Sequence, residues 1–375
     1  MPGRDVPLRI AVLSAQKDWG GGEDQARLLV CGLGKRGHNI LLMAPRVSSL
    51  AQKELPDGIA RAFFSSRQPA AAWQIRAAIR RLRPQILFWN DPKAAFLGTV
   101  ASLGLKARRI ATKRTVFPLR STILYRRFCD VVICASNAAV QVCRHAGLPP
   151  ERLRVVYDGV DQGRIRQASS VRGREVLHRL LPRAANFPNA VYLISVGKLT
   201  PVKGHSVLIE AFRSLAAERP NAFLAIVGAG ELREPLAAQI VDAGLADRVA
   251  LAGFREDVPD LLAAASLFVF PSLAEGLGSS VIHAMLLDLP VVASNVGGIP
   301  EILAAGGMDS GEPLGWLVPP GDSQSLSDAI SAALDLPDEV RRKRTADARS
   351  FAERHFVADR MVDNTLGVCY ELLGR

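Results

Sequence analysis

Residues 266–294, SLFVFPSLAEGLGSSVIHAMLLDLPVVAS, have the order of a strand, a loop, a helix and a second strand. A short apolar run is followed by a turn with two glycines, Gly276 and Gly278, which loosen the backbone. Either Ser279 or Ser280 can cap the helix that follows. The N–H groups at the start of such a helix suit a phosphate or sugar hydroxyls. The pattern predicts a strand–helix–strand unit with a ligand-binding turn.

The same alternation runs along the whole chain. Strands are predicted at residues 8–14, 40–45, 84–90, 108–114, 131–136 and 152–159. A polar stretch rich in Arg, Pro and Asn, residues 164–189, interrupts the alternation. Strands are then predicted at residues 191–197, 222–228, 248–254, 266–272, 290–294 and 315–321. This order predicts two doubly wound α/β domains, residues 1–185 and 186–350, followed by a helical segment, residues 351–375.

The composition is typical of a soluble globular protein, with 49% hydrophobic and 22% charged residues in a chain of 375. No run of about 18 apolar residues is present, so we expect no transmembrane helix. Residues 1–14 lack the long apolar region of a signal peptide, and we expect none. The five cysteines form no CxxC pair and no metal-ligand spacing. We therefore expect core cysteines in a reducing compartment, without a metal site.

The net charge of +11 is distributed unevenly along the chain. Residues 1–185 carry 32 Lys and Arg against 12 Asp and Glu, a balance of +20. Residues 186–375 carry 15 against 24, a balance of −9. A basic half suits an anionic surface, such as nucleic acid, lipid headgroups or a phosphorylated substrate.

Three loops that follow predicted strands are rich in glycine or lysine. GGGED (residues 20–24) opens the first predicted helix, and its glycines allow a ligand to approach the backbone. GAGELR (residues 228–233) lacks the third glycine of a dinucleotide fingerprint, and a tight turn is its simpler interpretation. GKLTPVKG (residues 197–204) presents Lys198 and Lys203, which could neutralise a diphosphate or lie free on the surface.

Glu275 stands directly before the glycine turn of the opening stretch, where a carboxylate can accept hydrogen bonds from sugar hydroxyls. NVGGIPEI (residues 295–302) follows the next predicted strand and adds a further glycine-rich loop on the same edge. Several such loops on one edge are more specific than any one alone.

In these motifs the chain resembles glycosyltransferase family 4, whose members have the GT-B fold and transfer sugars from nucleotide donors with retention of configuration. The matching blocks in the second half are VGKLTPVKGHSVLIEAF, AIVGAGELR, GFREDVPDLLAAASLFVFPSLAEGLGSSVIHAM, LPVVASNVGGIPEI and GWLVPPGD. The first half agrees in GGGEDQ before RGHNI and in KRTVFPLRSTILYRRFCDVVICASNAAV before RVVYDGVD. The resemblance implies two Rossmann-like domains facing across a cleft, with the C-terminal helix packed on the first domain.

The resemblance also implies roles for individual residues. Lys198 and Lys203 would contact the donor diphosphate, and Glu275 would hold hydroxyls of the donor sugar, so these three are the expected catalytic residues. Lys198 stands where the family usually has Arg, so a bidentate contact becomes a point charge. The donor site would further comprise Gly20, Gly21, Gly22, Gly197, Gly228, Phe254, Arg255, Gly276, Leu277, Gly278, Ser279, Ser280 and His283.

His283 replaces the second glutamate of the family signature, which binds the ribose hydroxyls. If both positions were helical, residues 275 and 283 would lie about 80° apart around the axis. A neutral imidazole can contact one ribose hydroxyl but cannot bridge two, as a carboxylate does. The alternative is a half-buried histidine bonded to a neighbouring carbonyl.

The expected reaction needs no metal ion, because no Asp-x-Asp motif stands in the expected position. The lysines would stabilise the leaving diphosphate while the acceptor hydroxyl attacks from the same face and gives its proton to the leaving phosphate oxygen. The donor would be a UDP- or GDP-sugar. The first domain would bind the acceptor, and its arginines, Arg80, Arg81, Arg114 and Arg120, are the candidate acceptor or surface residues.

The charge of that domain favours an anionic glycolipid or lipopolysaccharide core at a membrane surface. We accordingly expect a cytoplasmic protein, peripheral on the inner face of the cytoplasmic membrane. Two alternatives keep the fold: a nucleotide-sugar epimerase and a non-catalytic nucleotide-sugar-binding protein. A nucleic-acid partner is not expected, since the arginine clusters lack interleaved stacking aromatics. The sequence leaves the donor sugar, the acceptor linkage and the oligomeric state open.

Overall fold

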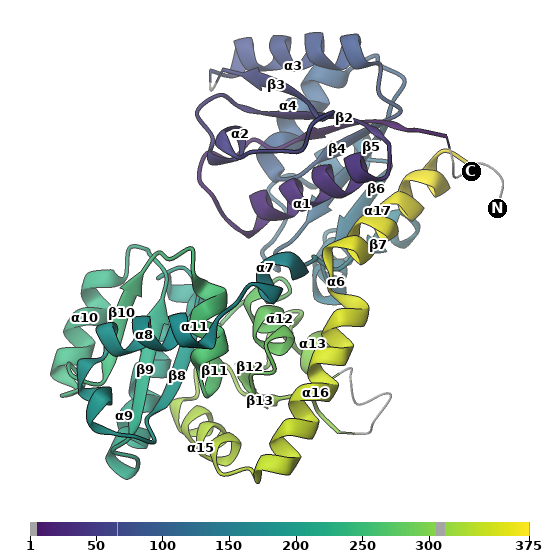
Figure 1. The fold of residues 1–375 in the computed structure, drawn as a ribbon. Coiled ribbons are helices and arrows are strands. Elements are labelled where there is room, and N and C mark those ends of the chain that lie inside the picture. Colours follow the sequence, from purple (N-terminus) through teal and green to yellow (C-terminus); the bar gives the residue numbers. More distant parts are fainter. Residues whose placement is uncertain (1–5, 66, 305–311, 375) are drawn as a thin grey trace. The chain divides into compact units, whose positions relative to one another are not determined.

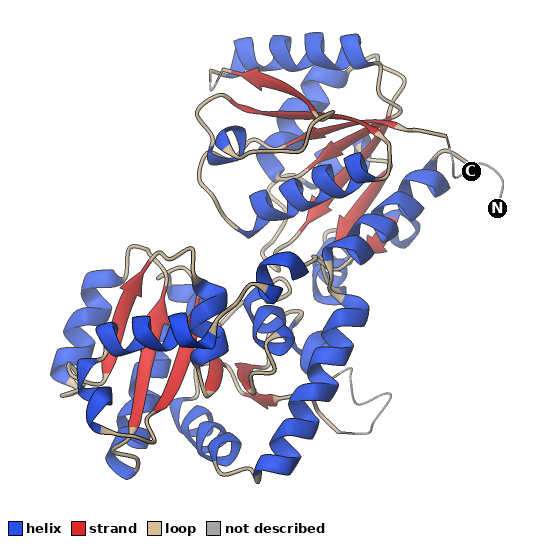
Figure 2. Ribbon diagram, viewed as in Figure 1, coloured by secondary structure: helices blue, strands red, loops and turns tan. Residues whose placement is uncertain are grey.

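The computed structural model describes residues 6–65, 67–304 and 312–374 and divides into two compact units. The first unit comprises Met1–Gly159 and Phe356–Arg375, and the second comprises Val160–His355. Each unit is a parallel sheet covered by helices on both faces (Figures 1 and 2). Two doubly wound α/β domains are therefore confirmed.

The first sheet has the strand order β3-β2-β1-β4-β5-β6-β7. Its strands are β1 (Arg9–Leu13), β2 (Asn39–Pro45), β3 (Ala60–Phe64), β4 (Ile86–Trp89), β5 (Arg108–Lys113), β6 (Val131–Cys134) and β7 (Leu153–Val155). All pairs are parallel, and Ile10 lies opposite Ile40 on one side and Ile86 on the other. The edge strand β3 was not predicted, because its residues are mostly exposed and lack an apolar run.

Helices cover both faces of this sheet. They are α1 (Gly21–Lys35), α2 (Ser49–Gln52), α3 (Gln68–Leu82), α4 (Pro92–Ser102), α5 (Thr122–Phe128), α6 (Asn137–His145) and the C-terminal α17 (Ala358–Leu372), with the short η1 (Pro150–Arg152). A Cβ on Gly32 of α1 would lie 2.4 Å from the Val362 side chain of α17, so the two helices pack closely. Arg36 adds ion pairs to Asp359 and Asp363. The C-terminal helix therefore packs on the first domain, as expected.

The second sheet has the strand order β10-β9-β8-β11-β12-β13, also entirely parallel. Its strands are β8 (Val191–Val196), β9 (Ala222–Val227), β10 (Val249–Gly253), β11 (Leu267–Phe270), β12 (Val291–Ser294) and β13 (Trp316–Val318). Its helices include η3 (Pro201–Lys203), α9 (His205–Glu218), α10 (Arg233–Asp242), α11 (Val258–Ala264), α12 (Ser279–Leu286), α13 (Ile299–Leu303) and α15 (Ser323–Leu334).

The predicted boundary near residue 185 is wrong, since the second unit begins at residue 160. The polar stretch forms α7 (Gln162–Arg166), α8 (Ser170–Leu180) and η2 (Pro182–Asn186). A Cβ on Gly173 of α8 would lie 1.9 Å from the Asp260 carbonyl oxygen of α11, and Arg172 holds the Asp260 carboxylate at 2.7 and 2.9 Å. These contacts fix α8 on the second unit.

The predicted C-terminal helical segment, residues 351–375, contains the end of one helix and the whole of a second. The first, α16 (Asp338–His355), belongs to the second unit, where Arg349 bonds Asp288 of the α12–β12 turn at 2.7 Å. The second, α17, belongs to the first unit. The division between the units therefore falls between His355 and Phe356 at this end of the chain.

In both sheets the strand order reverses at one point, between β1 and β4 in the first and between β8 and β11 in the second. Ligands of open parallel sheets bind outside the carboxyl ends of the strands at this switch point. The loops after these four strands are consequently the places to look for a site. Within the described residues, no helix is both long enough and apolar enough to cross a bilayer.

Candidate active site

Lys203 and Glu275 form an ion pair at the switch point of the second sheet. Lys203 ends η3, in the loop after β8, and Glu275 lies in the loop after β11. The Lys203 ammonium also lies 5.0 Å from the centroid of the Phe270 ring. The two side chains are 21% and 17% exposed, so they remain accessible. Two of the three predicted catalytic residues are thus in contact.

Two glycines hold the loops of this pair together. Gly204 has φ 65°, and a Cβ there would lie 2.0 Å from the carbonyl oxygen of Pro271. Gly297, in the loop after β12, has φ 57°, and a Cβ there would lie 1.7 Å from the carbonyl oxygen of Glu275. No other residue fits either position without moving the backbone. The backbone of Glu275 is therefore fixed from a neighbouring loop.

The helix after Glu275 begins differently from the prediction. Gly278, with φ 100°, is the N-cap of α12, and no side chain caps the helix. Ser279 and Ser280 lie in its first turn instead, so the prediction that one of them is the cap is wrong. Glycine takes the cap position because an L side chain would be strained at this φ. Gly278 as the N-cap therefore offers no side-chain acceptor to the first-turn N–H groups, which suits an anionic ligand.

The other members of this turn present backbone rather than side chains. Gly276 donates its N–H to Glu275 Oε1 at 3.2 Å, which orients the carboxylate. Leu277 is 3% exposed, and Gly276 and Gly278 are also buried. Leu277 can therefore contribute only its backbone to a ligand.

His283 lies half-buried in α12, and its Nδ1 is 2.8 Å from the Ser279 carbonyl oxygen. A carbonyl only accepts, so Nδ1 carries the hydrogen in this contact. This contact matches the alternative given for His283 in the sequence analysis, a half-buried histidine bonded to a neighbouring carbonyl. Glu275 precedes the helix, so the angle expected for two helical positions does not apply.

Lys198 is exposed, in the loop after β8, and makes no ion pair within the described residues. Its loop is packed against the GAGELR turn, where Leu199 N donates to Ala229 O at 3.0 Å. A Cβ on Gly228 would lie 1.9 Å from Gly197 O, and one on Gly230 would lie 2.4 Å from Leu199 O. The glycines of GAGELR are therefore required by close packing, as the simpler interpretation held.

Phe254 and Arg255 lie in the loop after β10. Phe254 is 67% exposed, and Arg255 binds the Asp257 carboxylate with two nitrogens at 2.7 and 2.6 Å. That hydrogen-bonded contact lowers the pKa of Asp257. The Gly253 carbonyl accepts a hydrogen bond from Gly228 N at 2.9 Å, so this loop adjoins the GAGELR turn.

The sequence did not single out His205, the first residue of α9. It is 2% exposed, and its ring lies against the backbone of the Gly197–Lys198 loop without a well-formed hydrogen bond to either ring nitrogen. Burial, together with the neighbouring Lys203 cation, lowers the pKa of His205 to about 4. A neutral ring therefore lies beneath the lysine loop. Only the position of His205 directly after the lysine loop could have indicated it.

In the first unit, the glycine loop after β1 is bonded to the loop after β4. Gly20 is the N-cap of α1, and the Gly22 carbonyl accepts a hydrogen bond from Asn90 Nδ2 at 3.0 Å. A Cβ on Gly21 would meet nothing within 4 Å, so packing does not require that glycine. Open space at Gly21 is compatible with the predicted approach of a ligand.

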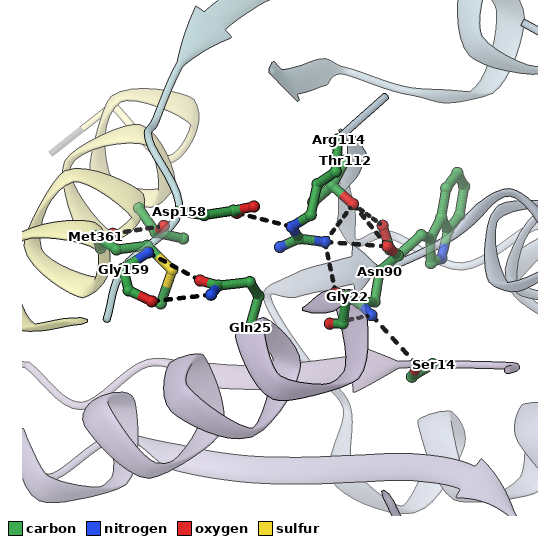
Figure 3. A network of polar contacts seen from close by, with 11 residues as sticks. Ser14, Gly22, Gln25, Asn90, Thr112, Arg114, Asp158, Gly159 and Met361 are labelled. Atoms are coloured by element: carbon green, nitrogen blue, oxygen red, sulfur yellow. Dashed lines mark hydrogen bonds and ion pairs between the residues drawn. The ribbon is translucent and has the colours of Figure 1, made fainter. Parts of the chain in front are cut away.

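Arg114, predicted as an acceptor or surface residue, lies partly buried at the end of β5. Its side chain is 15% exposed and bonds Asp158 at 2.9 Å, Asn90 Oδ1 at 2.7 Å and Thr112 Oγ1 at 2.9 Å (Figure 3). Beside this network, the Gln25 side chain donates to the carbonyl oxygen of Gly159 and accepts a hydrogen bond from its N–H. A guanidinium at the end of β5 reaches these acceptors inside the unit, which is why it is largely shielded from solvent.

The other predicted acceptor residues are exposed. Arg80 and Arg81 lie in the last turn of α3, and Arg120 precedes α5. No group of three or more His, Cys, Asp or Glu side chains that could hold a metal ion occurs among the described residues.

Family models match both halves of the chain. The model described as Glycosyl transferases group 1 matches residues 181–351, and the model described as Glycosyltransferase Family 4 matches residues 19–164. Among curated relatives, the amylovoran biosynthesis glycosyltransferase AmsK of Erwinia amylovora is 33% identical over 48% of this chain and 42% of its own length. A putative colanic acid biosynthesis glycosyltransferase WcaL of Salmonella typhimurium is 32% identical over 62% and 55%. The chain therefore spans about half the length of these relatives.

Solved structures share the fold over nearly the whole chain. Anabaena HepE, in complex with UDP and glucose, has a TM-score of 0.82 at 23% identity and covers 96% of this chain and 99% of its own. WaaG, a glycosyltransferase involved in lipopolysaccharide biosynthesis, has a TM-score of 0.69 at 17% identity, with 94% and 98% covered. The fold is GT-B. With family models matching both of its halves, the chain belongs to glycosyltransferase family 4.

Proposed function

We propose that this protein transfers a sugar from a nucleotide-sugar donor to a hydroxyl of a glycan or glycolipid acceptor, with retention of configuration. The observation that carries the proposal is the accessible Lys203–Glu275 pair at the switch point of the second sheet. Membership of the family supports the reaction class. No observation favours an epimerase or a non-catalytic binding protein.

The second unit would bind the donor. Lys198 and Lys203 would contact the diphosphate, and the uncapped first turn of α12 would add backbone N–H donors. Glu275 would accept hydrogen bonds from the donor sugar, and His283 would contact a ribose hydroxyl. HepE is solved with UDP and with UDP-glucose, which supports a uridine diphosphate sugar as the donor.

Donor binding would exchange one contact for two. The ammonium of Lys203 would move from the Glu275 carboxylate to the diphosphate, and the carboxylate would turn to the sugar hydroxyls. The bond between the anomeric carbon and the phosphate oxygen then breaks, with its electrons on the diphosphate, where the lysines stabilise the new charge. The acceptor hydroxyl forms the new bond on the same face and passes its proton to that phosphate oxygen.

The acceptor would meet the first unit, which is basic. Divided as the structure divides the chain, the first unit carries 28 Lys and Arg against 13 Asp and Glu, a balance of +15. The second unit carries 19 against 23, a balance of −4. Relatives named for amylovoran and colanic acid biosynthesis support a glycan acceptor, and the charge of the first unit supports an acceptor at an anionic membrane surface.

The test is release of nucleoside diphosphate from a panel of UDP- and GDP-sugars in the presence of lipid-linked glycan acceptors. The full chain is compared with Glu275→Gln and with the matched control Glu218→Gln, an exposed glutamate of α9. We expect turnover with one nucleotide, loss of turnover in Glu275→Gln and wild-type turnover in the control. Equal turnover in both variants would remove Glu275 from the site.

A further inference from the structure

The two faces of the first sheet carry different helices. The buried side chains of α3, α4, α5 and α6 form one core cluster with one face of the sheet, and those of α1 and α17 form another with the opposite face. Figure 1 shows α3 beside α4, and Arg76 of α3 donates to the carbonyl oxygens of Ala101 and Leu103 at 2.9 and 2.8 Å. The helices α3, α4 and α5 thus form a continuous layer, hereafter the basic layer.

The basic layer contains no acidic residue. Across the helices α3, α4 and α5, no Asp or Glu occurs and six Lys and Arg do: Arg76, Arg80, Arg81, Lys93, Arg126 and Arg127. On the opposite face, α1 and α17 together carry five acidic residues against three basic ones. Of the two helical faces of the first unit, one is therefore basic and the other slightly acidic.

Large apolar side chains are exposed on the same layer. Trp73 of α3 is 72% exposed, Phe96 of α4 is 49% and Ile123 of α5 is 74%. Val100 and Leu103 follow Phe96 at helical spacing, with 44% and 50% exposed. Described residues of α1 and α17 include no exposed large apolar side chain. Apolar and basic exposure thus coincide on one face.

This combination matches an anionic lipid bilayer. A surface that lies in the membrane interface buries Trp, Phe and aliphatic side chains at the boundary of the acyl chains. Lys and Arg beside them are attracted to acidic headgroups and keep their charges in the headgroup layer. Single-stranded nucleic acid would need a basic groove lined with stacking aromatics, whereas these side chains project from the outer surfaces of helices.

We propose that the basic layer is a membrane-docking surface, with Trp73, Phe96 and Ile123 entering an anionic bilayer and the arginines of α3 and α5 contacting its headgroups. The inference rests on the proposed function in one respect, since docking would serve a lipid-linked acceptor. It deepens that function by assigning the partner of the first unit to one face of it.

The experiment is flotation of the full chain with phosphatidylcholine vesicles, with and without phosphatidylglycerol. The test variant combines Trp73→Ser, Phe96→Ser and Ile123→Ser, which change only exposed side chains. The matched control combines Val241→Ser and Val340→Ser, which are 64% and 41% exposed on the second unit. A charge variant, Arg80→Glu with Arg81→Glu, tests the headgroup contribution. Melting temperatures of all variants establish that they fold.

We expect at least about tenfold tighter binding to the anionic vesicles than to neutral ones. The triple variant should lose about tenfold or more, the charge variant should lose the anionic preference, and the control should bind as wild type. Equal binding to both vesicles, or wild-type binding by the triple variant, would overturn the proposal. Binding of polyuridylate RNA that is lost in the triple variant would also overturn it, by assigning the layer to nucleic acid.

A UDP-induced rise in melting temperature separates this proposal from the proposed function. This UDP-induced rise reports on the second unit and should persist in every protein variant that is used for flotation. If the rise is absent while vesicle binding follows the expected pattern, the transferase proposal fails and the docking surface stands. If the rise persists while vesicle binding is absent, the docking surface fails alone.

Discussion

The two sheets share one strand order, yet their switch points are built differently. In the first sheet, Asp91 accepts a hydrogen bond from Ala15 N at 2.7 Å across the switch point and is 7% exposed. Asn90 similarly joins Ser14 to Gly22. In the second sheet, the corresponding loops carry Lys198, Lys203 and Glu275 with accessible charges. The same topology therefore holds a closed, internally bonded switch point in one unit and an open, charged one in the other.

The contrast extends to one ion pair in each unit. The Arg114–Asp158 pair is bonded to further acceptors inside the first unit, so its loss should affect folding. The Lys203 and Glu275 side chains are exposed to a similar degree, but within the described residues their only further hydrogen bond comes from Gly276 N, so loss of this pair should affect ligand binding. Both are ion pairs between a basic and an acidic side chain, so residue type does not distinguish a structural pair from a functional one. The number of other hydrogen bonds that each partner makes distinguishes them.

Replacement of Arg114 by Leu should produce the largest effect on stability. The change removes the ion pair to Asp158 and the hydrogen bond to Asn90 Oδ1, and breaking such a pair costs about 3–5 kcal/mol. Urea unfolding of the full chain measures the loss, with the exposed Arg144→Leu on α6 as control. A loss below about 1 kcal/mol would show that the first switch point is not closed as described.

Acidification should destabilise the second unit through His205. The pKa of His205 is about 4 in the folded state, below the ordinary value of 6.5, so between these values the unfolded chain binds more protons. Stability is complete above about pH 6.5 and falls as the pH is lowered towards 4, by up to about 3 kcal/mol. His205→Leu should flatten this part of the profile, while the exposed His145→Leu should not. Unfolding at several pH values tests the difference, and identical slopes for wild type and His205→Leu would contradict it.

Glu275→Gln should reduce transfer and spare nucleotide binding. Loss of a charged acceptor for sugar hydroxyls is worth about 1.5–3 kcal/mol, or roughly 10- to 150-fold in kcat/KM. The UDP dissociation constant should stay within about threefold of the wild-type value, since UDP lacks the donor sugar that Glu275 would bind. A parallel loss of UDP affinity would mean that the carboxylate shapes the diphosphate site rather than the sugar site.

His283→Glu should have the smallest effect. It restores a carboxylate that can bridge two ribose hydroxyls, so UDP should bind several-fold more tightly, a gain of about 1 kcal/mol. Uridine diphosphate titrated into both proteins gives the ratio. Unchanged or weaker binding would indicate that the Ser279 contact, rather than ribose, accounts for the histidine.

Sequence periodicity predicted most strands and their parallel order because buried parallel strands are continuous apolar runs. It missed β3, whose edge position leaves it mostly exposed. It misplaced the boundary because the arginine-rich stretch has the composition of a linker, whereas its Arg172 in α8 bonds Asp260 of α11. At the site, the positions of Lys203 and Glu275 in loops after two strands, together with the family resemblance, placed both residues in one predicted site. Motifs could not show the contacts of Arg114 or the burial of His205, since both depend on side chains from distant strands and loops.

The most direct test of the account is calorimetric titration of UDP into the full chain, Lys203→Met and the control Arg213→Met, an exposed basic residue of α9. The account predicts that UDP binds the wild type and the control alike. It predicts about tenfold or more weaker binding by Lys203→Met, since a charge-assisted contact to the diphosphate is lost. Equal affinity of all three proteins for UDP, or no binding of UDP or GDP by the wild type, would contradict a donor site at the switch point of the second sheet.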